Sequence, residues 1–137
     1  MTGYAITIEC PADKATLDVL NKGLDVFNAQ FSPGSYDYLT ASLRDGDTIK
    51  GGISAISWAG MLFIKWFWID EALRGQGHGT RILAAAEEEG RRRGCRAVWL
   101  DTFEFQARPF YEKLGYSLFG TLDYPEGFKR YFMQKAL

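Results

Sequence analysis

The amino-acid sequence predicts an α/β fold with a mixed β-sheet, and two observations carry this prediction. Residues 61–69 form a short run of apolar and aromatic side chains broken only by Lys65, which is typical of a buried strand. A charged helical segment and a second apolar run, residues 95–102, follow it. A helix therefore connects the two strands and makes them parallel neighbours. Shorter segments before this unit predict antiparallel strands, so the sheet is a mixed one.

Length, charge and hydropathy limit the possible classes of protein. The 137 residues predict one domain, residues 1–137, which is long enough to bury a hydrophobic core. The net charge of −1 and the pI of about 5.8 give no electrostatic reason to expect a nucleic acid or a membrane as a partner. No apolar run approaches the ~20 residues that a membrane span needs, and we see no signal peptide. We therefore expect a cytoplasmic protein.

The N-terminal segment predicts an edge strand and then an amphipathic helix. Residues 4–10 alternate weakly between apolar and polar side chains, and Pro11 ends the strand. Residues 13–31 predict the helix, with Asp13 as its N-cap. Its apolar face is formed by four residues at helical spacing: Leu17, Leu20, Leu24 and Phe27.

Two strands follow this helix. Residues 36–43 and 48–58 predict strands on either side of an Asp-Gly pair at 45–46, which is a hairpin signature. Turns are predicted at residues 32–35 and 59–60, because both stretches contain residues that favour turns.

A helix rich in charged residues follows the apolar run at residues 61–69. Ile82, Leu83 and Ala86 lie at helical spacing and predict its buried side, and Gly94 stands where a glycine ends a helix. Three pairs of opposite charge are spaced i,i+4 and predict ion pairs on its surface: Glu87/Arg91, Glu88/Arg92 and Glu89/Arg93.

The first turn of this helix carries no negative charge. Thr80 has no Glu or Gln three residues on, and Arg81 adds a positive charge to an end that is already positive. The preceding loop, residues 74–80, contains three glycines that let the backbone approach a ligand. A helix N-terminus that is free of protein anions and is reached through glycines predicts a phosphate-binding site.

A short helix and two strands complete the chain. Residues 106–114 predict the helix, with Pro109 in its first turn and Gly115 at its end. Residues 116–122 and 128–135 predict two closing strands.

The cysteines and the single histidine do not predict a metal site. Cys10 and Cys95 each fall in a predicted strand, and we expect two buried, reduced thiols because disulfides are rare in cytoplasmic proteins. One histidine and two scattered cysteines do not supply a metal-binding set of ligands.

Two short motifs lie at the loop before the charged helix and in the short helix near the end of the chain: RGQGHG at residues 74–79 and FYEKLGY at residues 110–116. With these motifs the chain resembles the GNAT superfamily of acyl-CoA-dependent N-acyltransferases. The pyrophosphate motif of that family is Gln or Arg, two residues, Gly, one residue, then Gly or Ala, and residues 74–79 (RGQGHG) fit it. A second family segment, with an aromatic pair and Glu-Lys before Leu-Gly-aromatic, is found at residues 110–116 (FYEKLGY). The resemblance covers essentially the whole chain. It implies a central mixed sheet flanked by helices, in which splayed parallel strands form the cofactor cleft.

The resemblance also implies how acetyl-CoA binds, with coenzyme A as product. Backbone groups near Phe67 and Ile69 are expected to pair with the pantetheine arm and the acyl carbonyl. Amides of seven residues are expected to wrap the pyrophosphate: Arg74, Gly75, Gln76, Gly77, His78, Gly79 and Thr80. Glu104 stands where family members often have a cofactor-binding Asn. Two interpretations stay open: Glu104 faces the acceptor amine, or Gln106 supplies the missing amide contact.

The transfer needs a neutral amine, a hydrogen-bond donor for the tetrahedral oxyanion and a proton for the departing thiolate. Tyr111 lies where many family members have a tyrosine as general acid, and a phenol with an ordinary pKa of about 10 is protonated at pH 7. Asp70 is the first candidate for a general base. Glu71 and Asp101, together with Glu104, are further candidates, although each carboxylate also suits a capping or solvated role. Water alone is an alternative base, and His78 is a weaker candidate because it lies in the phosphate loop.

We therefore predict an N-acetyltransferase that moves an acetyl group from acetyl-CoA to a primary amine by direct attack through a tetrahedral intermediate. Five aromatic residues are expected around the cleft and suit an amine with an apolar or cationic body: Trp66, Trp68, Trp99, Phe103 and Phe105. A non-catalytic acyl-CoA sensor is the alternative function. A dinucleotide oxidoreductase is disfavoured, because Thr80 replaces the third glycine of that fingerprint. A homodimer is implied only by the resemblance.

Overall fold

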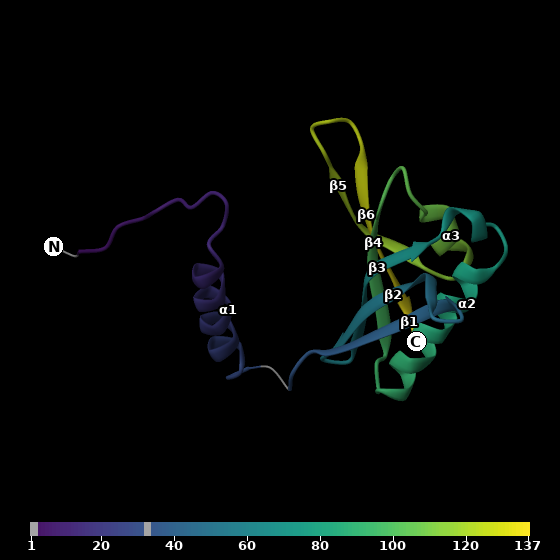
Figure 1. Ribbon diagram of the computed structural model, residues 1–137, viewed down its shortest axis with the longest axis horizontal. Coiled ribbons are helices and arrows are strands. Elements are labelled where there is room, and N and C mark those ends of the chain that lie inside the picture. Colours follow the sequence, from purple (N-terminus) through teal and green to yellow (C-terminus); the bar gives the residue numbers. More distant parts are fainter. Residues whose placement is uncertain (1–2, 32–33) are drawn as a thin grey trace. The chain divides into compact units, whose positions relative to one another are not determined.

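The computed structural model describes residues 3–31 and 34–137, which fall into two units (Figure 1). The first unit is Met1–Gly34 and the second is Ser35–Leu137. The prediction of one domain over residues 1–137 stays a prediction. Part of the predicted turn at residues 32–35 lies outside the described residues.

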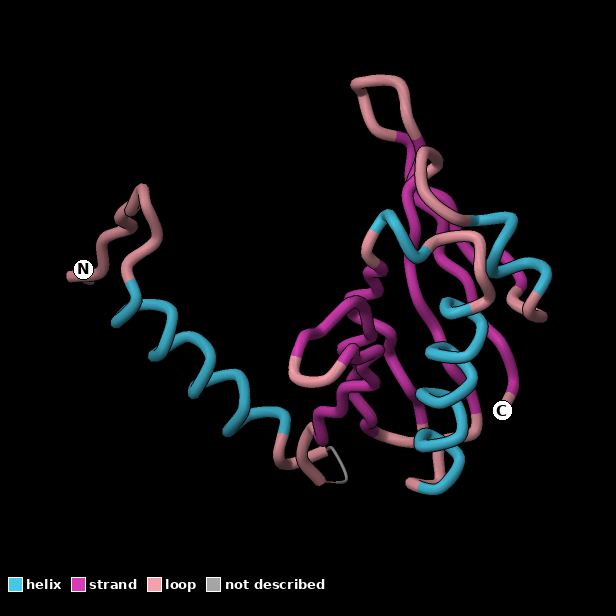
Figure 2. Tube along the Cα trace, turned by 45° about the vertical axis from the view of Figure 1, so that its right-hand side comes forward, coloured by secondary structure: helices cyan, strands magenta, loops and turns pink. Residues whose placement is uncertain are grey.

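The N-terminal unit contains one helix, α1 (Lys14–Asn28), shown as the helix nearest the N-terminus in Figure 2. Asp13 is its N-cap, as predicted, and the Asp13 carboxylate accepts a hydrogen bond of 3.1 Å from the backbone N–H of Thr16. The helix ends three residues before the predicted end. Its apolar side chains are exposed: Leu17, Leu20, Leu24 and Phe27.

The predicted edge strand at residues 4–10 is wrong. This stretch has no regular secondary structure, and its apolar side chains Tyr4, Ile6 and Ile8 are exposed. A strand forms only with a hydrogen-bonding neighbour, which a weak alternation of side chains does not provide. Cys10 is consequently exposed instead of buried, whereas Cys95 is buried just before a strand, and both thiols are free.

The C-terminal unit is built on a six-stranded sheet in the order β1-β2-β3-β4-β6-β5 (Figure 1). The strands are β1 (Asp37–Asp45), β2 (Thr48–Trp58), β3 (Met61–Ile69), β4 (Ala97–Phe103), β5 (Ser117–Asp123) and β6 (Lys129–Ala136). Neighbours are antiparallel except for β3 and β4, which are parallel. The prediction of an α/β fold with a mixed sheet is confirmed.

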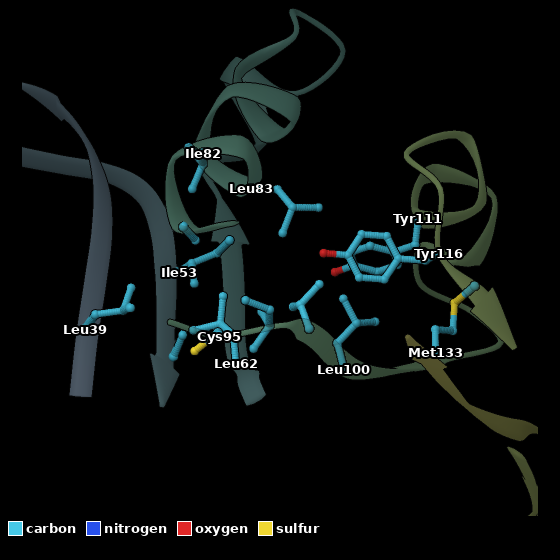
Figure 3. Packing of buried hydrophobic residues seen from close by; sticks show 14 of the residues in the cluster. Leu39, Ile53, Leu62, Ile82, Leu83, Cys95, Leu100, Tyr111, Tyr116 and Met133 are labelled. Carbon is cyan, nitrogen blue, oxygen red and sulfur yellow. The ribbon is translucent and has the colours of Figure 1, made fainter. Parts of the chain in front are cut away.

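Helix α2 (His78–Arg92) follows the short 3-10 helix η1 (Glu71–Leu73) and packs against β1, β2 and β3. Its buried side contains Ile82, Leu83 and Ala86, as their spacing predicted. Figure 3 shows Leu83 on the helix side of the core, facing the sheet residues Leu62 and Leu100, which are almost completely buried. Burial of these aliphatic side chains supplies the main stabilisation of the unit.

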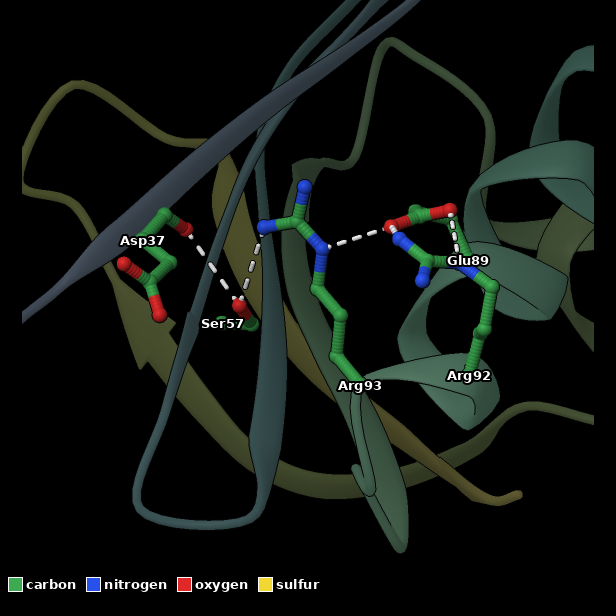
Figure 4. Close-up of polar contacts among 5 residues, drawn as sticks. All are labelled: Asp37, Ser57, Glu89, Arg92 and Arg93. Carbon is green, nitrogen blue, oxygen red and sulfur yellow. Dashed lines mark hydrogen bonds and ion pairs between the residues drawn. The ribbon is translucent and has the colours of Figure 1, made fainter.

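The charged residues of α2 pair differently from the prediction. Of the three predicted i,i+4 pairs only Glu89–Arg93 forms, at 2.7 Å, and Arg93 also donates a hydrogen bond to Ser57 of β2 (Figure 4). Arg91 and Arg92 instead bind the carboxylates three residues before them. The predicted Glu87–Arg91 pair is wrong because Glu87 lies on the buried side of the helix.

The chain closes with α3 (Arg108–Lys113), β5 and β6. Pro109 lies in the first turn of α3, as predicted, where its missing N–H breaks no helical hydrogen bond. Gly115 ends this helix segment with a φ of +94° and turns the chain into β5. Helix α3 is shorter than the predicted span of residues 106–114.

Candidate active site

Strands β3 and β4 pair over only the first part of their length. The parallel register joins Met61–Ile64 to Ala97–Leu100 and stops there, although β3 continues to Ile69. At the same point the β2–β3 register shifts, and Lys65 is the extra residue on β3. A β-bulge bends the strand that carries it. The bulge at Lys65 therefore directs β3 away from β4 and opens the sheet.

A cavity of about 690 Å³ lies at this opening and is lined by three segments of the C-terminal unit. These are the end of β3, the loop from η1 into α2, and the stretch from the end of β4 into α3. Most of the predicted site residues line the cavity: Phe67, Ile69, Arg74, Gly75, Gly77, Gly79, Thr80 and Tyr111. The lining does not include Gln76, His78 or Asp70.

The loop into α2 has a backbone that only glycine adopts easily. Gly75 and Gly77 have φ values of +73° and +83°. Gly77 is the N-cap and offers no capping side chain, and the first turn of α2 has no acidic residue. The first N–H groups of α2 therefore have no helical acceptor and point toward the loop. These features match the anion site predicted from the sequence.

Gly79 allows the start of α2 to pack closely on the cavity wall. A Cβ atom at Gly79 would lie 3.2 Å from Cδ1 of Ile69 and 3.3 Å from Cζ of Phe110. Both distances are shorter than ordinary van der Waals contact, so a larger residue would require the side chains of Ile69 and Phe110 to move by a few tenths of an ångström. The absence of a side chain at Gly79 thus permits close packing of the start of α2 on the cavity wall.

The polar side chains of the loop bind their own chain. Arg74 donates from Nε to the carbonyl of Ile69 at 3.0 Å, and Gln76 donates to the carbonyl of Ala72 at 3.0 Å. His78 lies 3.5 Å from Arg81, between Nδ1 and Nη1. The groups that the loop offers to a ligand are therefore mainly backbone N–H groups.

The peptide groups of Phe67 and Ile69 face the opening in the sheet. The N–H of Asp70 donates to the carbonyl of Lys50 in β2 at 2.8 Å, so Asp70 faces β2. Main-chain groups alternate in direction along a strand, which turns Phe67 and Ile69 away from β2. The hydrogen bond from Arg74 to the Ile69 carbonyl is consistent with this direction.

Asp70 has a capping role in this structure. Its carboxylate accepts a hydrogen bond of 3.0 Å from the N–H of Ala72 and lies 3.9 Å from the ammonium of Lys50. The other carboxylates proposed from the sequence are also engaged or remote. Asp101 binds Arg130 at 2.9 Å, and Glu104 accepts a hydrogen bond of 3.4 Å from Tyr131. None of the residues that line the cavity in the described part of the chain is acidic.

Tyr111 lies on α3, is only 7% exposed and lines the cavity. Burial raises its pKa to about 12, and the nearby charge of Asp101 acts in the same direction. The phenol is therefore held in its protonated form at neutral pH. The ring contacts Phe67 and Tyr116, with centroid distances of 6.4 and 5.7 Å. In Figure 3 the hydroxyls of Tyr111 and Tyr116 point in the same direction.

The cavity also contains residues that had no role in the sequence prediction. Leu73, Ala107 and Phe110 line it, and Phe110 lies beside Tyr111 in the second family segment, which was the available signal. Gln106 lines the cavity as well, but its Oε1 atom accepts a hydrogen bond of 2.7 Å from the N–H of Phe103. The Gln106 side chain thus holds the loop after β4.

The described residues contain neither a cluster of metal-ligating side chains nor a membrane-spanning helix. In residues 3–31 and 34–137, no three or more His, Cys, Asp or Glu side chains gather where they could hold a metal ion. No helix in the same part of the chain is both long and apolar enough to cross a bilayer.

Comparison with known proteins places the chain among acetyltransferases. The sequence model of the acetyltransferase (GNAT) family matches residues 11–116. Acetyltransferase Atu2258 of Agrobacterium fabrum is 33% identical over 113 residues, which are 81% of this chain and 82% of that protein. Blasticidin-S acetyltransferase of Streptomyces morookaense is 33% identical over 103 residues, 73% of this chain and 75% of that protein.

Solved structures have the same fold. An acetyltransferase from Bacillus cereus has a TM-score of 0.84 and 27% identity over 96% of this chain and 98% of that chain. An aminoglycoside 6′-N-acetyltransferase solved with coenzyme A has a TM-score of 0.64 and 22% identity, and covers 72% of both chains. The second likeness concerns the fold alone.

Proposed function

The chain belongs to the acetyltransferase (GNAT) family, and on this premise we propose that it transfers an acetyl group from acetyl-CoA to a primary amine. The observation that carries the proposal is the cavity at the opening between β3 and β4. It combines the uncapped N-terminus of α2, the unpaired edge of β3 and the protonated Tyr111.

We propose that the pyrophosphate of acetyl-CoA binds the main-chain amides from Arg74 to Thr80. The positive φ angles of Gly75 and Gly77 and the missing side chain at Gly79 support this assignment, because they leave the amides open to an anion. The peptide groups of Phe67 and Ile69 are proposed to pair with the pantetheine arm and the acyl carbonyl. The residues present therefore fit the cosubstrate that the family uses.

In the proposed reaction the neutral amine attacks the thioester carbon directly. The new C–N bond forms a tetrahedral intermediate whose oxyanion accepts a hydrogen bond from a backbone N–H of β3. The C–S bond then breaks, and Tyr111 donates its proton to the departing thiolate. The nitrogen loses one proton, so charge and protons balance once Tyr111 is reprotonated. The raised pKa keeps Tyr111 protonated at neutral pH, although it also makes the phenol a weaker proton donor.

The proposed base is water or bulk buffer acting on the amine before it binds. The contacts of Asp70 with Ala72 and Lys50 favour capping, and a catalytic role for Asp70 stays a prediction. The lack of acidic lining residues among those described also keeps a second candidate function open, a non-catalytic acyl-CoA sensor.

The test is release of free thiol from acetyl-CoA in the presence of a panel of primary amines. We include blasticidin S, because the acetyltransferase of that name is 33% identical to this chain. Thiol release that depends on the amine is the expected result. Tight binding of coenzyme A without turnover on the whole panel would favour the sensor, and binding of NAD(P) without coenzyme A would contradict both. The cytoplasmic location and the homodimer stay predictions.

A further inference from the structure

Past the bulge, β3 carries two exposed tryptophans on one face of the sheet. Trp66 and Trp68 are 66% and 54% exposed, whereas Phe67 and Ile69 pack against the core. Ile69 also lies beside Gly79 of α2. Alternate residues of a strand face opposite sides of the sheet, so the two indoles lie on the face opposite α2.

The residues that line the cavity come from both sides of the sheet. They include Gly79 and Thr80 of α2, and Trp68, whose side chain alternates to the opposite face. Because β3 and β4 are not paired beyond Ile64, the opening between them joins these two sides. If acetyl-CoA binds the phosphate loop on the α2 side of the sheet, the acceptor amine can enter from the face that carries Trp68.

A second exposed aromatic ring lines the cavity from the segment after β4. Phe105 is 70% exposed, yet it stacks on Phe103 with a centroid distance of 5.3 Å and an interplanar angle of 1°. Phe128 contacts both rings at 5.5 and 5.8 Å. Phe105 is therefore held in place by a cluster of aromatic rings. An exposed ring that is fixed in this way is available to stack on a ligand without further ordering.

The charges around this side favour an uncharged ligand body over a cationic one. Arg74 is the one charged residue among those that line the cavity in the described chain, and its guanidinium already binds the Ile69 carbonyl. The ammonium of Lys65 lies 4.8 Å from the ring centroid of Trp66 and takes the cation-binding position over that indole. A positively charged body would meet repulsion from Lys65 and no carboxylate in the lining.

We propose that Trp68 and Phe105 form the acceptor subsite, and that the acceptor is a small primary amine whose body is a flat, uncharged aromatic ring. This inference rests on the proposed N-acetyltransferase function and names the substrate class for it. The ring of the acceptor stacks between the aromatic walls, and its amine extends toward Tyr111.

Steady-state rates with three amines test the subsite: phenethylamine, cyclohexylethylamine and hexamethylenediamine. The first two have the same size, but only the first is flat, and the third carries a charged body. We expect kcat/KM for phenethylamine to exceed the other two by about fivefold or more, since each of the two aromatic side chains adds about 0.5–1.5 kcal/mol beyond area burial and 1.4 kcal/mol is tenfold. In Trp68→Ala and Phe105→Ala this preference falls to about twofold, while KM for acetyl-CoA is unchanged. Trp68→Phe keeps most of it.

Tyr38→Ala is the matched control, because Tyr38 is an exposed aromatic on β1 that does not line the cavity. It leaves the amine preference unchanged. An equal loss of rate with all three amines in Trp68→Ala would overturn the subsite. Turnover without preference for the flat amine overturns this inference alone, whereas no turnover with any amine overturns the proposed function and this inference with it.

Discussion

Tyr116 donates a hydrogen bond of 2.7 Å to the carboxylate of Glu87, which is only 5% exposed. The ammonium of Lys135 binds the same carboxylate at 3.0 Å. Glu87 belongs to α2, whose N-terminus begins the proposed phosphate site, and the ring of Tyr116 contacts that of Tyr111. The buried Glu87 carboxylate thus links α2, which begins at the proposed phosphate site, to Tyr116. The ring of Tyr116 in turn packs against Tyr111, the proposed proton donor.

We expect Glu87→Ala to lower the free energy of unfolding by about 2–3 kcal/mol. The substitution leaves the hydroxyl of Tyr116 without its acceptor and the ammonium of Lys135, which is 25% exposed, without its partner. Tyr116→Phe keeps the ring and loses only the hydroxyl, so its cost is about 1–3 kcal/mol. Urea unfolding measures both. Glu88→Ala is the control, because the exposed Glu88–Arg91 pair contributes about 0–1 kcal/mol. Equal losses for Glu87 and Glu88 would contradict the buried pair.

The pH dependence of stability follows from the two buried tyrosines. Burial raises the pKa of Tyr111 to about 12, and burial together with the Glu87 carboxylate raises that of Tyr116 still further. Below pH 10 both the folded and the unfolded chain keep these protons, and the full stability is present. Above pH 10 only the unfolded chain releases them, so stability falls as pH rises toward 12.

Urea unfolding from pH 8 to pH 11.5 measures this fall. Tyr111 alone contributes at most about 3 kcal/mol, because one pKa unit corresponds to about 1.4 kcal/mol. In Tyr111→Phe the free energy of unfolding should therefore fall less steeply above pH 10. In the double variant with Tyr116→Phe it should fall less steeply still. Tyr38→Phe, at an exposed site, should leave this pH dependence unchanged. The same fall in all variants would show that the pKa values of the two phenols are not raised.

Tyr111→Phe should lower turnover by about 10²–10⁴-fold, the usual contribution of a general acid. Binding of coenzyme A should change little, because the ring and its contacts with Phe67 and Tyr116 remain. Thiol-release kinetics and calorimetry separate the two effects. Tyr38→Phe serves again as the control. Unchanged turnover would remove Tyr111 from the mechanism, and weaker binding alone would make it a packing residue.

The sequence predicted the order of the elements well, because that order depends on local patterns. The apolar run at residues 61–69 and the helical spacing of Ile82, Leu83 and Ala86 both reflect which side of an element is buried. The bulge at Lys65 could not be predicted. A lysine inside an apolar strand has many explanations, and a bulge is defined by the register with the neighbouring strand, here β2.

The errors of prediction arise where tertiary contacts compete with local patterns. Residues 4–10 alternate like a strand but have no partner strand in the described structure. Glu87 is spaced to bind Arg91 on the helix surface, yet Tyr116 and Lys135 bind it on the buried side. Asp70 was placed near the cleft by its position at a strand end, but the direction of its carboxylate depends on the 3-10 turn that it caps.

Asp70→Asn distinguishes a cap from a general base. Asparagine caps a helix about as well as aspartate, so the contact with the N–H of Ala72 survives. If Asp70 only caps, turnover should stay within about threefold and the free energy of unfolding within about 0.5 kcal/mol of the original protein. A fall of about 10²-fold or more in kcat, with stability retained, would restore Asp70 as the base.

Gly77→Val should abolish binding of coenzyme A while the protein still folds. A Cβ at Gly77 meets no atom within 4 Å, so the substitution adds bulk on the open side of the loop, where we place the pyrophosphate. The φ of +83° makes valine cost roughly 1–2 kcal/mol or more of stability.

Gly127→Val is the matched control for this substitution. Gly127 has a φ of +94° and equally open surroundings, but it lies in the turn between β5 and β6 and does not line the cavity. Both variants should lose similar stability in urea unfolding, because both force a branched residue into a left-handed backbone. Calorimetry should then show normal coenzyme A binding for Gly127→Val and a loss of about 100-fold or more for Gly77→Val. Equal binding by the two variants would mean that the diphosphate does not lie on this loop, since the strain is shared and only the location differs.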